Sequence, residues 1–177
     1  MCCTEVKLIE PSQEFRNQFL AMVAEHLAVD RFVDRWDFKE ATEDFDVYIN
    51  KLDDYAKGRN LPQGWVPSTT YWLLRDDKVL LGSSSLRQQL TPALGRFGGH
   101  IGYYIRPSQR RKGYGMQILK LTIDKAKQLG LSRVLVTCDD DNVASARIIE
   151  KCGGVCVDKV MVEGHEIPTR RYWIEIQ

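Results

Sequence analysis

The segment from residue 101 to residue 138 constrains the fold more than any other part of the chain. Its helix starts near Gly113, and one side of it is apolar at the spacing of a helix packed on a core. That side is formed by Ile118, Leu119, Thr122, Ile123, Ala126 and Leu129. Gly130 then stands where a left-handed helix end favours glycine. A strand over 101–105 precedes this helix, and a continuous apolar strand over 134–138 follows it, which indicates burial on both faces.

The rest of the chain reads as further strands and helices, so we expect an α/β protein. Strands are predicted over 5–9, 71–75, 79–86, 155–163 and 170–176, and helices over 12–27, about 43–57 and 142–151. Residues 91–99 contain Pro92 and three glycines and are expected to form a loop. No repeat or linker interrupts the pattern, which predicts a single domain over residues 1–177.

Composition narrows the class of protein. The 177 residues, 44% hydrophobic and 28% charged, suit a soluble domain with a sizeable core. No apolar run approaches the ~20 residues of a membrane helix, and the first residues do not resemble a signal peptide. Five scattered cysteines without a C-x-x-C pair argue against a disulfide framework or a zinc site. We therefore expect a cytoplasmic protein with reduced thiols, no metal and no membrane partner.

The near-neutral net charge of +1 hides an asymmetry. Residues 1–60 contain 8 Lys/Arg and 13 Asp/Glu, a balance of −5, whereas residues 61–177 contain 17 and 11, a balance of +6. This pattern would suit a cationic ligand on one side and an anionic ligand on the other, and the alternative, which the asymmetry alone favours, is chance placement on a solvated surface. The basic excess is too small to predict nucleic-acid binding.

The turn before the helix at 113 has the composition of a phosphate cradle. Arg110, Arg111 and Lys112 bring three cations, and Gly113 and Gly115 permit close approach of the main chain to a ligand. The free N–H groups of a helix's first turn attract anions. The Walker A motif lacks its Gly-Lys-Ser/Thr here, and the dinucleotide fingerprint lacks one of its three glycines. An ordinary solvated turn remains the alternative.

In context, this segment resembles a known family. Arg110-x-x-Gly113-x-Gly115, after Tyr103-x-Ile105-x-Pro107 and before an amphipathic helix, is similar to motif A of the GNAT superfamily of N-acetyltransferases. The strand over 134–138 and the helix after Asn142 are similar to its motif B. The resemblance implies a mixed, mostly antiparallel sheet of six or seven strands flanked by helices, with a central strand splay. It also implies transfer of an acetyl group from acetyl-CoA to an amine.

The resemblance further implies which residues hold the cofactor. Tyr103, Tyr104 and Ile105 would bind the pantetheine arm through main-chain groups, and the Ile105 N–H would stabilise the oxyanion. Asn142 would hydrogen-bond the cofactor beyond the splay, with a simple helix cap as the alternative. The pyrophosphate and the further phosphate would lie on residues Arg110, Arg111, Lys112, Gly113, Tyr114, Gly115 and Met116.

Catalytic groups are less clear from the sequence. Many relatives carry a tyrosine acid where this chain has Ile149, which cannot donate a proton. His100 stands at the head of the splayed strand, where many relatives carry a glutamate, and its ordinary pKa of ~6.5 suits a general base. The alternative is a histidine that packs or bonds a loop. Cys138 would lie near the thioester, where a small buried residue is the plain reading.

The acceptor is expected to be a small-molecule or peptide amine. Trp36, Phe38 and Trp65 are candidates for its pocket, and Asp139 is a candidate for its charge, with core packing and a solvated turn as the alternatives. The missing tyrosine keeps a second function open, a non-catalytic acyl-CoA sensor of the same fold. The sequence leaves the oligomeric state open, with a homodimer as one alternative.

Overall fold

The computed structural model describes residues 5–29 and 38–176. The helices of this part are α1 (Arg16–Val29), α2 (Phe38–Glu43), α3 (Phe45–Ala56), α4 (Pro92–Arg96), α5 (Tyr114–Gln128) and α6 (Val143–Lys151), with short 3-10 turns at Gln13–Phe15 and Pro107–Gln109. The strands are β1 (Val6–Ile9), β2 (Ser68–Arg75), β3 (Val79–Arg87), β4 (Ile101–Ile105), β5 (Arg133–Asp139), β6 (Val155–Val160) and β7 (Thr169–Glu175).

The strands form one seven-stranded sheet in the order β1-β2-β3-β4-β5-β7-β6. Every neighbouring pair is antiparallel except β4 and β5, which are parallel. This confirms the expected mixed, mostly antiparallel sheet. None of the helices in the described ranges has the length and hydropathy needed to span a bilayer.

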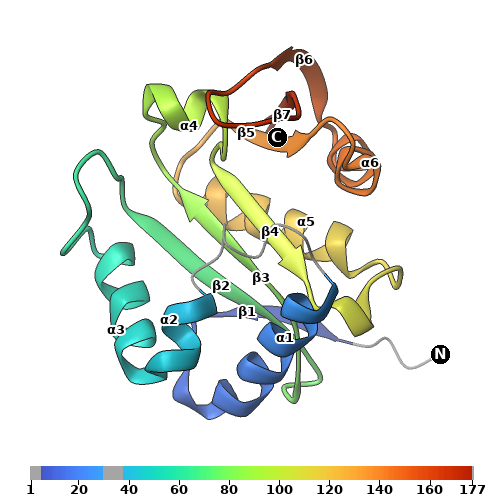
Figure 1. The fold of residues 1–177 in the computed structure, drawn as a ribbon. Helices are drawn as coiled ribbons and strands as arrows, with labels where there is room; N and C mark the ends of the chain where they lie inside the picture. The colour runs from blue at the N-terminus through green and yellow to red at the C-terminus, as the bar shows by residue number, and fades with distance from the viewer. Residues whose placement is uncertain (1–4, 30–37, 177) are drawn as a thin grey trace.

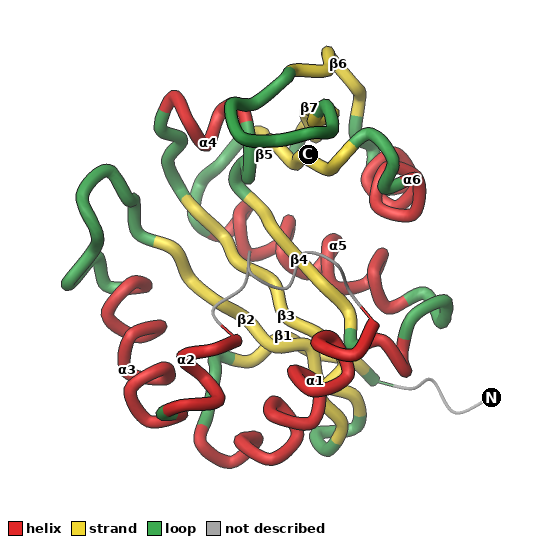
Figure 2. The backbone as a smooth tube through the Cα atoms, viewed as in Figure 1, coloured by secondary structure: helices red, strands yellow, loops and turns green. Residues whose placement is uncertain are grey.

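Helices lie on both faces of the sheet. In Figure 1, α1 and α2 lie in front of the strands, and α5 lies behind them. The tube drawing in Figure 2 shows β2, β3 and β4 side by side between α4 and the layer of α1, α2 and α3. The N-terminal layer and α4 are therefore at opposite ends of one sheet face, with the central strands between them.

The expected loop over 91–99 is wrong in part, because it contains the short helix α4. Thr91 caps this helix by accepting a hydrogen bond from the Leu94 N–H at 3.1 Å. Pro92 stands at the helix start, where its missing N–H costs nothing. The cap and the proline were both visible in the sequence, but five residues are too few to show helical periodicity.

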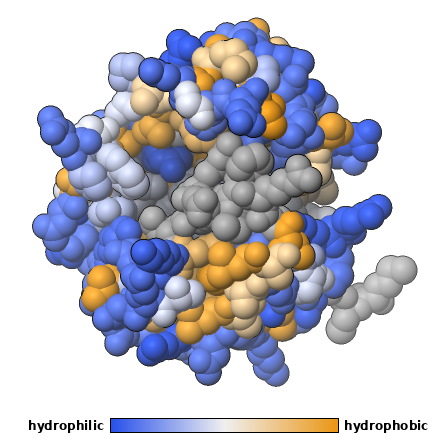
Figure 3. All heavy atoms as spheres, in the orientation of Figure 1, coloured by the Kyte–Doolittle hydropathy of each residue, from blue (hydrophilic) through white to orange (hydrophobic). Residues whose placement is uncertain are grey.

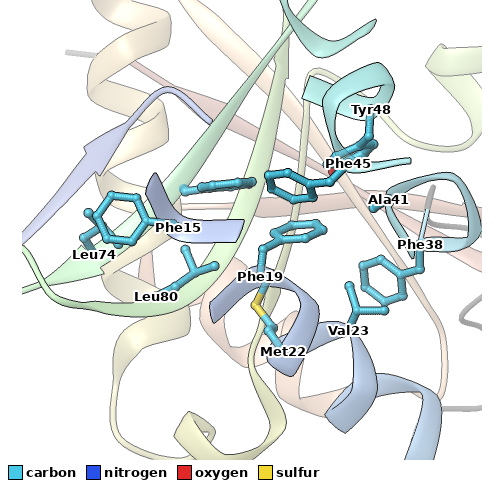
Figure 4. Close-up of a cluster of buried hydrophobic side chains, with 11 residues drawn as sticks. Phe15, Phe19, Met22, Val23, Phe38, Ala41, Phe45, Tyr48, Leu74 and Leu80 are labelled. Carbon is cyan, nitrogen blue, oxygen red and sulfur yellow. The ribbon is translucent and has the colours of Figure 1, made fainter. Parts of the chain in front are cut away.

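The core under α1, α2 and α3 is built largely from aromatic rings. Phe19 of α1 stacks on Trp72 of β2 with ring centroids 4.8 Å apart. The rings of Phe38, Phe45 and Tyr48 surround Phe19 at centroid distances of 6.4, 5.9 and 5.3 Å. Figure 4 shows these side chains pointing toward one another from three helices. This packing holds the N-terminal layer over one end of the sheet.

A second core lies under α5 and α6. Val134 and Val136 of β5 and Ile101 of β4 pack there with Leu119 of α5 and Ile149 of α6. All five are at most 1% exposed. Because successive strand residues point to opposite faces, His100, Gly102 and Tyr104 lie on the other face of the sheet. That alternation decides which side chains can line a site.

Candidate active site

β4 and β5 separate soon after they begin. Their only cross-strand pair in the described residues is Ile101 with Val136. The expected splay of the central strands is therefore present, and it lies just before the turn that leads into α5.

The alternation of antiparallel hydrogen bonds shows which main-chain groups of β4 face this opening. The Arg106 N–H donates to the Leu81 carbonyl, and the Arg87 N–H donates to the His100 carbonyl, both at 2.8 Å. In this register the even-numbered residues of β4 bond to β3, so the main-chain groups of Tyr103 and Ile105 face β5. Those of Tyr104 face β3 instead. The expected main-chain contact from Tyr104 to pantetheine does not fit this register.

The same reasoning applies to β5. The Asp140 N–H donates to the Pro168 carbonyl at 2.8 Å, and Cys138 pairs with Arg170 of β7. The main-chain groups of Thr137 and Asp139 therefore face β4. Two strand edges oppose each other without a ladder of hydrogen bonds between them. Unpaired main-chain N–H and carbonyl groups inside a sheet cost free energy. A ligand with amide groups, lying along the opening as a strand does, would satisfy them.

A concave run of N–H groups lies where β4 leads into α5. Arg111 has a φ of 61°, and Gly113, the N-cap of α5, has a φ of 84°. Left-handed residues in a turn gather N–H groups into a concavity that binds anions. The first turn of α5 adds its own unpaired N–H groups, and the helix dipole favours negative charge there. The geometry fits the predicted phosphate cradle.

The three cations of this turn do not have the same surroundings. The Arg110 Nε donates to the Ile105 carbonyl at 3.1 Å, and its guanidinium lies 3.4 Å from the His26 Nδ1. The Lys112 ammonium donates to the Ser108 carbonyl and the Gln109 side chain, both at 3.1 Å. Within the described part of the chain, Arg111 has no such partner. Arg111 is thus the cation best placed to meet a phosphate.

The two glycines of the motif, Gly113 and Gly115, are required for different structural reasons. A Cβ on Gly113 would meet nothing within 4 Å, so its left-handed φ and the open space beside it explain this glycine. A Cβ on Gly115 would lie 2.7 Å from the Ile148 Cδ1 of α6. Gly115 therefore permits close packing of α5 and α6, and its expected role beside the phosphates stays a prediction. Tyr114 likewise points into the core, where its hydroxyl accepts from Arg75 at 3.1 Å.

Side chains from β4, β5 and α6 meet beside the opening. The Tyr103 hydroxyl lies 3.0 Å from the Ser145 hydroxyl, and Ser145 lies near enough to the Cys138 thiol to lower its pKa slightly against the effect of burial. Burial raises the pKa of Tyr103, and it raises the pKa of Cys138 to about 11. Cys138 is thus a neutral thiol at physiological pH, which suits the expectation that it is not a nucleophile. Asn142 caps α6 by accepting from the Ser145 N–H at 3.0 Å.

His100 is tied into the sheet. The main-chain N–H of His100 donates to the Leu135 carbonyl, and the imidazole Nδ1 accepts from the main-chain N–H of Leu135, both at 2.8 Å. Burial lowers the pKa of His100, and the charges of Arg87 and Arg133 lower it further. A neutral imidazole can accept a proton on one of its two nitrogens. In His100 this nitrogen is Nδ1, which already accepts the hydrogen bond from Leu135. This geometry favours a structural role, and the assignment of His100 as a general base stays a prediction.

Two variants separate these roles. His100→Asn keeps an acceptor near the position of Nδ1, so we expect wild-type kcat, whereas His100→Ala leaves the Leu135 N–H unpaired at a cost of about 1–3 kcal/mol. Because the pKa of His100 is lowered by folding, the unfolded chain binds the proton more readily, and wild-type stability falls as pH drops below ~6.5. The Asn variant should lose this part of the acid sensitivity in thermal melts. If it instead loses kcat and the acid limb of the rate profile, His100 is the base.

The expected acceptor residues do not lie together. Phe38 is buried, and its ring contacts Tyr104 of β4 at 5.6 Å. Trp65 is 56% exposed and lies against Tyr55 of α3. Asp139 lies at the end of β5, opposite Thr169. Trp36 is outside the described residues. Of these, Phe38 contacts β4 and Asp139 ends β5, the two strands that border the opening.

The sequence matches a family model for the acetyltransferase (GNAT) domain over residues 7–155. The chain belongs to this family. Structure comparison agrees with that assignment. RimL, a ribosomal alpha-N-protein acetyltransferase solved with coenzyme A, superposes with a TM-score of 0.70 at 15% identity, covering 98% of this chain and 95% of that chain. MccE, the microcin C7 self-immunity acetyltransferase solved with acetyl-CoA and AMP, gives a TM-score of 0.69 at 13% identity, with 97% and 93% covered.

One curated GNAT relative is the uncharacterized N-acetyltransferase YnaD of Bacillus subtilis strain 168. It is 28% identical to this chain over 115 residues, which cover 63% of this chain and 58% of YnaD. The match therefore spans less than two thirds of that relative's length. The likeness to the solved structures, at identities of 15% or less, concerns the fold.

Sequence reasoning missed Ser145 as a site residue of this GNAT chain. The available signal was its place three residues after Asn142, where a helix cap brings a side chain and an N–H together. It also missed Glu25 of α1, whose carboxylate accepts from the Arg106 side chain and the Ser108 N–H at 2.7 and 3.0 Å. These bonds lower the pKa of Glu25 although burial opposes them. Glu25 thus fastens α1 to the turn before the cradle.

Proposed function

We propose that this chain transfers the acetyl group of acetyl-CoA to a primary amine of a small molecule or peptide, by direct attack in a ternary complex. The observation that carries the proposal is the pair of unpaired strand edges between β4 and β5, which leads directly to the anion-binding start of α5. An amide-containing arm that ends in phosphates fits both features at once. Acetyl-CoA has this composition, and when bound it supplies an activated thioester.

The residues of this site have separate roles in the proposal. The main-chain groups of Tyr103 and Ile105 hold the pantetheine arm, and the N–H groups of residues 111–116 hold the phosphates. The Ile105 N–H is the oxyanion donor, since it faces the opening from β4. The side chain of Arg111 adds charge at the phosphates.

Proton transfers complete the proposed reaction. Ser145 donates a proton to the departing thiolate, with the Tyr103 hydroxyl behind it at 3.0 Å. The acceptor amine has an ordinary pKa of ~10.4 and must lose a proton before it attacks. Because the Nδ1 of His100 is engaged by Leu135, we propose water as the group that takes this proton. The free thiols of Cys138, Cys152 and Cys156 suit a reducing cytoplasm, which we propose as the location.

Ligand binding and thiol release test this proposal together. Acetyl-CoA at 100 times its Kd should stabilise the fold by about 2.7 kcal/mol, which raises Tm by roughly 5–10 °C for a domain of this size. ATP and NAD at the same concentration should raise Tm much less. Free coenzyme A should then appear with some members of a panel of amino acids, peptides, polyamines and aminoglycosides.

The results also separate the proposal from its alternatives. Equal stabilisation by ATP would contradict the cofactor assignment. Strong acetyl-CoA binding without thiol release across the whole panel would favour the acyl-CoA sensor. The missing tyrosine at Ile149 motivates that alternative, and the buried position of Ile149 among α6 and β5 residues gives it a packing role in either case.

A further inference from the structure

The sheet face opposite α5 has a floor of small side chains. Ser85 of β3 pairs with Thr70 of β2 and Gly102 of β4. All three are partly exposed, although they lie on central strands. A Cβ on Gly102 would come within 3.2 Å of the Ser85 hydroxyl. Thr70, Ser85 and Gly102 therefore project little above the sheet. The space-filling view in Figure 3 shows this face hollowed between α4 and the α2–α3 region, with hydrophilic atoms at the bottom of the hollow.

Arg87 stands at one end of this floor. It lies two residues after Ser85 on β3 and therefore on the same face, and its N–H donates to the His100 carbonyl. Its guanidinium donates to the Gly99 carbonyl at 3.3 Å. Among the residues that the structure describes, no carboxylate pairs with it. Burial lowers the pKa of Arg87, and no anion of the described residues opposes this effect.

Within the described residues, this partly exposed guanidinium has one weak acceptor, which is an unusual arrangement. Buried charges in proteins are normally paired, because loss of hydration is otherwise uncompensated. Arg87 has five N–H donors in a planar fork, and in the part of the chain that the structure describes its one acceptor is a carbonyl, so most of the fork has no partner there. Such a group, at the end of a hollow, suits a ligand that brings its own negative charge.

The neighbours of Arg87 add positive charge and a flat apolar surface. Arg133 of β5 lies over the ring of Trp173, with its guanidinium carbon 4.3 Å from the centroid. The ring of His100 is 5.9 Å from the same tryptophan. The charges of Arg87 and Arg133 both act on His100, so the two guanidinium groups are close neighbours of one imidazole. The cluster thus has two arginines around one histidine and one indole.

We propose that Arg87, supported by Arg133 and Trp173, binds an oxyanion group, a carboxylate or a phosphate, at the far end of the acceptor molecule. This inference rests on the proposed acetyl transfer, since it names the class of amine that the site takes. It differs from the simplest reading of the charge asymmetry, which favours a cationic acceptor over the acidic N-terminal part. Acids of that part are engaged in ion pairs, Asp53 and Asp54 with Arg59, and Glu25 with Arg106.

The strand register fixes the length of such an acceptor. Arg87 is level with His100, and Tyr104, beside the opening, lies four residues further along the chain. At ~3.3 Å per residue this is about 13 Å. An amine placed at the opening would therefore have its oxyanion group roughly 10–13 Å away. A tripeptide with a free carboxylate or an aminoalkyl phosphate of eight carbons has this span.

Matched pairs of acceptors test the proposal. Trialanine is compared with its C-terminal amide, and aminooctyl phosphate with aminooctanol, so that each pair differs only in the anionic group. We expect wild-type kcat/KM to favour the anionic member by about 10–100-fold, the range of a hydrogen-bonded charge. The pair with the larger ratio identifies carboxylate or phosphate as the natural group. Arg87→Gln should reduce the ratio to near one, and Arg87→Lys should keep part of it.

Controls separate this proposal from the proposed function and from misfolding. Arg96→Gln removes an exposed arginine that donates to the Met161 carbonyl and should keep the wild-type ratio. Binding of each acceptor to the coenzyme A complex, measured by calorimetry, shows the preference even if no acetyl is transferred. Thiol release without any anionic preference in wild type overturns the inference and leaves acetyl transfer intact. A folded Arg87→Gln protein with an undiminished ratio also overturns it.

Discussion

Replacement of Ser145 by alanine is expected to lower kcat by about 10²-fold or more, the usual contribution of a positioned acid. The Ser145 hydroxyl lies 3.0 Å from the Tyr103 hydroxyl and close to the Cys138 thiol, and in the proposed site it is the group that meets the departing thiolate. KM for acetyl-CoA should change little, because in the proposed site main-chain groups hold the pantetheine and the phosphates. Single-turnover release of coenzyme A measures the chemical step directly.

Variants of the same group of residues sharpen this result. Ser145→Thr retains a hydroxyl and should recover much of the rate, and Tyr103→Phe should cost less than Ser145→Ala because it removes only the group behind the donor. Ser132→Ala, at an exposed serine before β5, is the matched control and should be silent. A folded Ser145→Ala protein with wild-type single-turnover kinetics would remove Ser145 from the mechanism.

Elements with strong local periodicity were predictable from the sequence. The helix expected from about 113 to 129 is α5 at Tyr114–Gln128, and its predicted apolar face is the one that packs on the sheet. The continuous apolar strand expected over 134–138 is β5, which has α5 and α6 on one face. Periodicity, a glycine cap and apolar runs are properties of a few adjacent residues, so they can be read without the fold.

Short elements were harder to predict. α2 and α4 have six and five residues, which is less than two helical turns. Phe38 illustrates the reason, since its place in α2 is stabilised by contacts with Phe19 and Tyr104. Those partners are distant in the sequence, and no local pattern announces them.

Roles of single residues depended on contacts across the chain. The Nδ1 of His100 bonds a residue 35 positions away, and the Arg110 guanidinium lies beside a histidine 84 positions away. Gly115 faces Ile148 of α6, so the absence of a side chain at residue 115 also serves helix packing, which the motif did not announce. The motif pointed to the splay and the turn before α5 as the candidate site, but it did not distinguish main-chain contacts from side-chain contacts. The hydrogen-bond register of β3, β4 and β5 made that distinction.

Replacement of Gly113 by valine should abolish acetyl-CoA binding at concentrations that saturate the wild-type protein. Gly113 has a φ of 84°, and a side chain there would project into the open space beside the predicted phosphates. The substitution should destabilise the fold by about 1–2 kcal/mol, because a β-branched residue disfavours the left-handed region. Loss of hydrogen bonds from the cradle to phosphate should also raise the Kd for acetyl-CoA by about 100-fold or more. Calorimetry and the acetyl-CoA-dependent shift in Tm measure both effects.

The same helix offers a control with matched backbone strain. Gly130 follows the end of α5 with a φ of 83°, and a Cβ there would also meet nothing within 4 Å. Gly130→Val should therefore lower Tm by a similar amount, yet bind acetyl-CoA as the wild-type protein does. Equal loss of binding in both variants would mean that strain in α5, and not obstruction at its first turn, weakens the site. Wild-type affinity in Gly113→Val would place the phosphates elsewhere, because a branched side chain at residue 113 cannot share that space with them.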